Sequence, residues 1–172
     1  MLLSLLSIAY AGIVIYNVLS TSPIAVLYTW HPICSNLFIV FASLGTASAQ
    51  AIRGTIAQSR TAKEPYVNRH GLFNWLALFS LIGAAATIYL NKERNNRPHL
   101  TTYHGVSGGA TGVIFMANVF GGGAINTVPG LYKYIRFHRL GGYLIYTAVL
   151  ATHATAVWRG YAGFRAPEQV RG

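Results

Sequence analysis

The strongest constraint on the fold of this chain is the near absence of charge along much of its length. No Lys, Arg, Asp or Glu precedes Arg53, and charged residues make up only 9% of the 172 residues against 53% apolar residues. Soluble domains are about one quarter charged. The composition therefore predicts an integral membrane protein, in which helices satisfy their own backbone hydrogen bonds within the lipid.

Five apolar stretches are long enough, at about 20 residues each, to cross a bilayer as helices. Polar and basic loops separate them, notably at 53–69 and 91–103. The first stretch lacks the basic start of a signal peptide, so we expect an uncleaved helix. The sequence predicts an all-α membrane protein with five transmembrane helices and a single domain over 1–172. Its parts are a peripheral helix at 2–19, a four-helix antiparallel bundle within 24–158 (later spans 70–90, 104–124 and 138–158) and a tail at 159–172.

The net charge of +10 raises the question of a nucleic-acid partner. However, the basic residues lie in the loops between apolar stretches, where membrane topology and anionic headgroups place them. We therefore expect a lipid bilayer and no nucleic acid as the partner. Both sides of the membrane carry similar numbers of basic residues, so the positive-inside rule does not fix the orientation.

Four consecutive predicted spans each begin near a histidine, namely His31, His70, His104 and His138. These histidines are roughly 35 residues apart, the length of one membrane helix and a short loop. Because consecutive spans run in opposite directions, His31 and His104 are predicted near one membrane face, and the other two near the opposite face. Pairs of side chains on facing helices of a bundle are a common arrangement for a cofactor site.

Two imidazoles per site favour haem over other metal centres. Zinc and copper usually take further ligands such as carboxylate or thiolate, but the chain has three acidic residues and one cysteine, Cys34. A porphyrin supplies four ligands itself. The lone cysteine also excludes the CxxCH motif of covalently attached haem. Small residues that admit either a porphyrin or a packed helix lie at the fourth position after each histidine: Ser35, Asn74, Gly108 and Gly142.

The sequence thus predicts two non-covalent haem b groups, each with two axial histidines. Such iron has no open coordination site, so the expected chemistry is single-electron transfer between haems at opposite leaflets. A fifth apolar-stretch histidine, His153, lies about 22 Å along the helix from His138 and is outside this pattern. We interpret it as a hydrogen-bonded structural residue.

Three motifs make the chain resemble the cytochrome b561 family, especially its shorter domain-containing branch. They are WHP at Trp30–Pro32, KERNNRPHLTTYHG at Lys92–Gly105 and FHRLGGYL at Phe137–Leu144. The likeness extends over residues 28–158. It implies a bundle of antiparallel helices with two b-type haems, the first held by His31 and His104 and the second by His70 and His138.

The resemblance further implies an ascorbate-dependent transmembrane oxidoreductase that passes electrons to monodehydroascorbate or ferric iron. Family members bind the anionic donor with basic residues beside the haem recess. On one face the candidates are Arg53, Lys63 and Arg69, with Lys133 and Arg136 nearby. Their alternative role is contact with lipid headgroups or haem propionates. On the opposite face His99 is a candidate for contact with a substrate or chelate, or else a solvated loop residue.

Family members usually have six spans, whereas five are predicted here. A protein partner would cover the flank that the sixth span covers elsewhere. The alternative function is therefore an accessory or structural subunit of a larger membrane complex, for example a respiratory one, without turnover of its own. The resemblance implies an endomembrane or plasma-membrane location, and this alternative implies the mitochondrial inner membrane.

Overall fold

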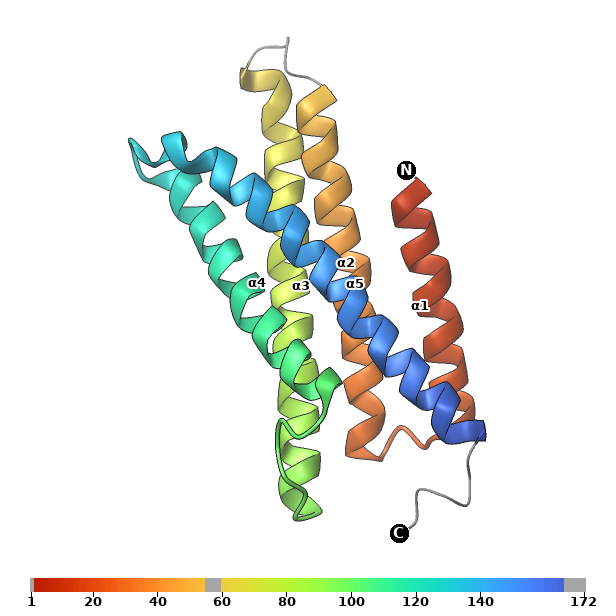
Figure 1. Cartoon of the computed structure of the whole chain (residues 1–172). Coiled ribbons are helices and arrows are strands. Elements are labelled where there is room, and N and C mark those ends of the chain that lie inside the picture. Colours follow the sequence, from red (N-terminus) through yellow and green to blue (C-terminus); the bar gives the residue numbers. More distant parts are fainter. Residues whose placement is uncertain (1, 55–59, 166–172) are drawn as a thin grey trace.

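The computed structural model describes residues 2–54 and 60–165, and in these two ranges the chain is helical with no strand (Figure 1). Short connections join the helices. The elements are α1 (Leu2–Thr21), α2 (Leu27–Gly54), α3 (Arg60–Arg94), α4 (Tyr103–Thr127), the short 3-10 helix η1 (Leu131–Tyr134) and α5 (Ile135–Arg165).

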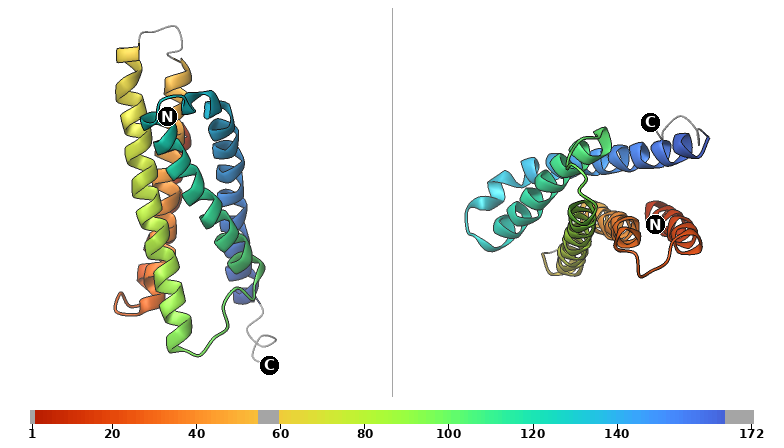
Figure 2. Two further views of the ribbon diagram at one scale, coloured as in Figure 1. Left: turned by 90° about the vertical axis from the view of Figure 1, so that its left-hand side faces the viewer. Right: turned by 90° about the horizontal axis from the view of Figure 1, so that it is seen from below.

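The helices lie in two rows when the molecule is seen along its long axis (Figure 2, right). Helices α1, α2 and α3 form one row, and the hairpin of α4 and α5 forms the other. α5 crosses obliquely over the first row and reaches the end of α1 (Figure 1). Between the rows, α3 packs against α4 and α2 packs against α5. Helices α2 and α4, and likewise α3 and α5, therefore lie diagonally across the bundle and meet through their side chains.

Each long helix extends beyond the apolar stretch that predicts it, and the extension is longest at the start of α3 and the end of α5. α3 begins at Arg60, inside the stretch 53–69 that was expected to be a loop, and α5 continues to Arg165, past the expected end at Trp158. α3 also continues to Arg94, so the loop predictions are wrong chiefly for 60–69 and 91–94. Arg, Lys and Glu are good helix formers, so a helix fixed within the lipid continues into its polar flanks. Residues 55–59 of the expected loop and 166–172 of the expected tail lie outside the described ranges.

Four of the described helices, α1 to α4, are long and apolar enough to cross a membrane. Many large apolar side chains on the outer surface are exposed, among them Ile13, Phe79 and Leu144. Exposed apolar side chains in such numbers fit a lipid environment. The chain is thus an integral membrane protein. α5 has 31 residues but is not among the four helices that qualify, so a fifth span stays a prediction.

The core lies where the two rows meet, midway along the bundle. Its central contact is edge-to-face packing of Phe38 on α2 against Phe115 on α4, with ring centroids 4.9 Å apart. All four bundle helices contribute buried apolar residues to one cluster: Phe38, Ile39, Ala42, Ala77, Leu78, Phe115, Val119, Ile145 and Val149. This cluster joins the two rows and separates the two ends of the bundle.

One buried hydrogen bond also joins the rows. Ser43 on α2 is fully buried, and its Oγ lies 2.7 Å from the Tyr146 hydroxyl on α5. Because the Ser43 hydroxyl donates to the Ile39 carbonyl, Tyr146 must be the donor to Ser43. Removal of the Tyr146 hydroxyl leaves the buried Ser43 oxygen without this donor.

We expect Tyr146→Phe to lower the free energy of unfolding by about 1 kcal/mol, the usual contribution of one hydrogen bond. Unfolding of the detergent-solubilised protein, followed by circular dichroism, measures the change. Tyr132→Phe is the control because its side chain is 70% exposed. Equal stability of the two variants would contradict the role of this hydrogen bond.

Candidate functional site

The four histidines that begin the predicted spans are brought together as two pairs. His31 on α2 faces His104 on α4 with ring centroids 6.2 Å apart. His70 on α3 faces His138 on α5 with centroids 6.0 Å apart. In both pairs the rings come from alternate helices, as the alternation of helix direction predicts. The two pairs lie at opposite ends of the bundle.

Three of the four rings are oriented by a backbone carbonyl of the neighbouring helix in the chain. His31 Nδ1 lies 2.8 Å from the Ala84 carbonyl on α3. His70 Nδ1 lies 2.9 Å from the Gly45 carbonyl on α2. His104 Nδ1 lies 3.1 Å from the Thr152 carbonyl on α5. Within each hairpin, a helix therefore orients a histidine ring of its partner helix, and that ring faces a histidine of the other row.

These contacts determine which ring nitrogen is available. A carbonyl oxygen only accepts hydrogen bonds, so Nδ1 must carry the proton in each of the three rings. In a neutral imidazole the other nitrogen, Nε2, then holds a free lone pair. Histidine ligands of metals are typically held in this way, with the second nitrogen donating to a carbonyl or carboxylate. The three rings are thus in the tautomer that a metal ligand requires.

The separation within each pair also fits a metal centre. A metal–imidazole bond is about 2 Å long and the ring nitrogen lies about 1 Å from the ring centre, so two imidazoles on one ion have centroids about 6 Å apart. The observed centroid separations are 6.2 and 6.0 Å. Within the described residues, no cluster of three or more His, Cys, Asp or Glu forms at either pair. The protein therefore offers two ligands per site, which fits haem iron.

His138 is held differently from the other three. It lies beside the backbone of Asn118 on α4, yet its buried Nδ1 has no hydrogen bond of ordinary geometry within the described ranges. Its ring instead packs against Gly122, where an added Cβ would lie 2.6 Å from His138 Cε1. Only glycine leaves room for the ring, so Gly122 positions His138 by contact.

The carbonyl contacts follow a rule that the sequence interpretation missed. Gly45, Ala84, Asn118 and Thr152 each lie about four helical turns, or about 21 Å, beyond the histidine of their own helix. Each helix thus carries a ring at one end and supports the ring of its hairpin partner at the other. Every residue has a backbone carbonyl, so the sequence does not indicate which carbonyls contact a ring. The one available signal is that none of these four positions carries a bulky side chain.

Glycines at the fourth position after a histidine serve helix packing. A Cβ on Gly108 would meet the Thr152 side chain at 3.5 Å, and one on Gly142 would meet Asn118 at 3.8 Å. Both contacts are made between α4 and α5. Of the two roles left open for these residues, the structure supports packing within the α4–α5 hairpin.

The basic candidates near His70 and His138 occupy different places. Arg53 at the end of α2 donates from Nη1 to the Tyr143 hydroxyl on α5, 3.0 Å away, and so bridges the two rows. Lys63 is half-buried on the first turns of α3. Arg69 lines a groove formed by α1, α2 and α3. On the second row, Lys133 and Arg136 pack over the rings of Tyr134 and Phe137, respectively.

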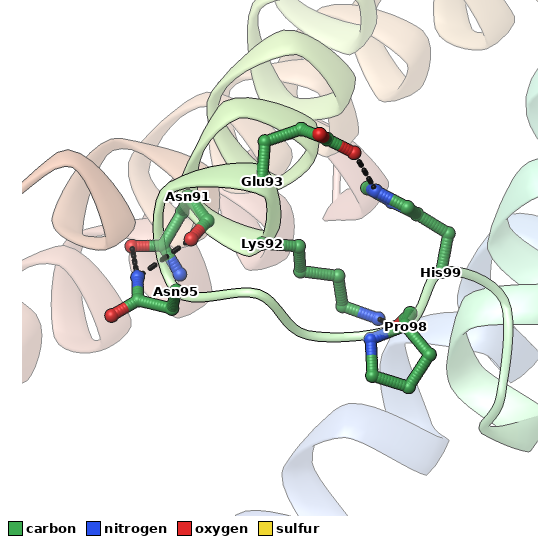
Figure 3. Close-up of polar contacts among 6 residues, drawn as sticks. All are labelled: Asn91, Lys92, Glu93, Asn95, Pro98 and His99. Atoms are coloured by element: carbon green, nitrogen blue, oxygen red, sulfur yellow. Dashed lines mark hydrogen bonds and ion pairs between the residues drawn. The ribbon is translucent and has the colours of Figure 1, made fainter.

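His99 lies in the connection between α3 and α4, at the other end of the bundle. Its Nε2 is 2.7 Å from Glu93 Oε1, and its ring stacks on Tyr89 with centroids 4.6 Å apart. Figure 3 shows the contact of His99 with Glu93 beside the hydrogen bond from Lys92 Nζ to the Pro98 carbonyl. The connection is therefore held in one conformation against the end of α3.

His153 packs against α1 and joins neither pair. Its ring meets that of Tyr10 edge to face, with centroids 6.1 Å apart. The expected structural role thus takes the form of an aromatic contact, and no hydrogen bond to this ring is found within the described ranges. The contact links the end of α5 to the peripheral helix.

A membrane-embedded bundle with pairs of facing imidazoles is an arrangement typical of membrane proteins that hold a cofactor between their helices. The family model for eukaryotic cytochrome b561 matches residues 30–161, and the chain belongs to this family. It is accordingly a membrane protein that transfers electrons by means of haem b. No curated protein and no solved structure gives a match to the chain.

Proposed function

We propose that the chain passes single electrons across its membrane through two haem b groups. His31 and His104 would hold one haem, and His70 and His138 the other. The observation that carries the proposal is the set of Nδ1 contacts to backbone carbonyls, which leave Nε2 free on facing rings. Iron held between two imidazoles supplies one-electron chemistry with no site for oxygen or substrate.

The residues of the chain hold the rings of both sites in place. Carbonyls of the neighbouring helix in each hairpin orient three of the four imidazoles, so little rearrangement accompanies a change of charge at the site. The cluster around Phe38 and Phe115 fills the space between the two pairs. Such an apolar layer disfavours the entry of water and ions. Electrons can cross such a layer, whereas ions cannot.

We further propose ascorbate as the donor, with monodehydroascorbate or ferric iron as the acceptor. Support comes from membership of the family and from the basic residues at the end of the bundle near His70 and His138. Arg53 and Lys63 lie on the first row there, and Lys133 and Arg136 on the second. At the opposite end, His99 on its fixed connection is the candidate for contact with the acceptor.

A visible spectrum of the purified protein tests this function. We expect ascorbate to reduce most of the haem that dithionite reduces, because a donor of this family must reach at least one site directly. Proteoliposomes loaded with ascorbate should then reduce an external ferric chelate, and empty proteoliposomes serve as the control. Haem that only dithionite reduces would contradict the proposal and favour a structural subunit of a larger complex.

A further inference from the structure

A groove on the outer side of the first row is not used by the histidine pairs. Its volume is about 370 Å³, and every residue that lines it belongs to α1, α2 or α3. The lining residues are Ser4, Leu44, Ala47, Ser48, Ala51, Tyr66, Arg69 and Phe73. None of the four paired histidines and no residue of α4 or α5 is among them. The groove is therefore built from residues other than the candidate haem ligands.

The lining of the groove includes apolar residues, here called the floor, and the polar pair Arg69 and Tyr66, here called the mouth. Leu44, Ala47 and Ala51 of α2 form the floor together with Phe73 of α3. Arg69 and Tyr66 lie at the end of the groove nearer the start of α3. Arg69 is also the last basic residue before the apolar stretch 71–90. An arginine and a tyrosine at that level lie where the headgroups of a bilayer meet its acyl chains.

No ion pair to Arg69 is found in the part of the chain that the structure describes. Within the described ranges, Arg69 makes no ion pair and no hydrogen bond, and its side chain is exposed. The ion pair of Glu93 with His99 lies at the opposite end of the bundle. Arg53, Arg60 and Lys63 add further positive charge in the sequence before Arg69, and Glu64 is the one acidic residue between Arg53 and Arg69.

We propose that this groove binds one phospholipid with an anionic headgroup. The phosphate lies against the Arg69 guanidinium and the Tyr66 hydroxyl, and one acyl chain lies along the apolar floor between α1 and α2. Arginine recognises phosphate with two parallel N–H donors. Basic sites between membrane helices are typical binding sites for anionic lipids. This inference goes beyond the proposed function and does not depend on it.

Native mass spectrometry of the full chain tests the site. The protein is reconstituted in phosphatidylcholine nanodiscs with a minor share of phosphatidylglycerol, released into mild detergent and analysed for retained lipid. We expect wild-type protein to retain one phosphatidylglycerol in preference to phosphatidylcholine. Arg69→Gln should lower that retention at least tenfold. Arg136→Gln removes the same charge from the same end of the bundle, outside the groove, and should retain the lipid as wild type does.

A second variant tests the floor of the groove. Ala47→Phe fills it without a change of charge and should also abolish retention. Haem absorption and gel-filtration profile report whether each variant is folded. Equal loss of phosphatidylglycerol retention in Arg69→Gln and Arg136→Gln would overturn the proposal in favour of a general effect of positive charge. Displacement of the lipid by millimolar inorganic phosphate would overturn it in favour of a site for free anions. Unchanged lipid retention with a raised KM for ascorbate in Arg69→Gln would assign Arg69 to the donor instead.

Discussion

His104→Ala is expected to remove one of the two proposed haems and to spare the other. The alanine leaves His31 without a second imidazole, although its Nδ1 remains bonded to the Ala84 carbonyl. The other pair is about 21 Å away along the bundle, behind the buried Phe38 and Phe115. The haem content per chain should therefore fall by about half, since sites this far apart behave independently.

The pyridine haemochrome assay, together with protein concentration, measures this ratio. His153→Ala is the matched control because it removes another imidazole from the same bundle, whose ring packs against Tyr10 on α1. This control should keep the full haem content. Loss of all haem in a folded His104→Ala protein, or loss of none, would contradict the assignment of His104 to one of two separate sites.

Gly122→Ala is expected to disable the site of His70 and His138 without touching either histidine. A Cβ at residue 122 would lie 2.6 Å from His138 Cε1 and 3.2 Å from both ring nitrogens. Because the ring is buried between α4 and α5, it must rotate or the helices must separate. Either movement takes Nε2 away from the partner ring. We expect haem affinity at this site to fall by about 10-fold to 100-fold, as for other residues that position metal ligands.

Haem titration of the apoprotein, followed at the Soret band, measures this affinity. Gly121→Ala is the control, because no atom outside the helix lies within 4 Å of an added Cβ at that position. It should bind both haems as wild type does and gain slightly in helix propensity. If Gly121→Ala and Gly122→Ala bind haem equally well, contact with Gly122 does not position His138.

The two substitutions act on different ends of the bundle, so their effects should add. The double variant His104→Ala/Gly122→Ala is expected to hold little haem, because each change affects one pair. A shared cause, such as general unfolding, would instead make each single variant lose haem from both sites. The pair of variants thus tests whether each histidine pair is a separate unit.

The sequence by itself determined the helical membrane fold and the pairing of the histidines. Apolar stretches of membrane length require helices, since backbone polar groups have no other partners in lipid. Helices that follow one another through short loops must alternate in direction. His31 and His104 therefore share one end of the bundle, and His70 and His138 the other, as observed. This conclusion needs only the lengths of the apolar stretches and the positions of the four histidines.

The tertiary structure alone decided what surrounds each ring. The carbonyls of Ala84, Gly45 and Thr152 become hydrogen-bond acceptors only because two antiparallel helices pack in one particular register. Gly122 matters only because α5 brings His138 against it, and Arg69 faces a groove only because α1 packs beside α2. Helix direction and length follow from local interactions along the chain, whereas register and rotation depend on side-chain packing between distant segments, which no stretch of sequence specifies alone.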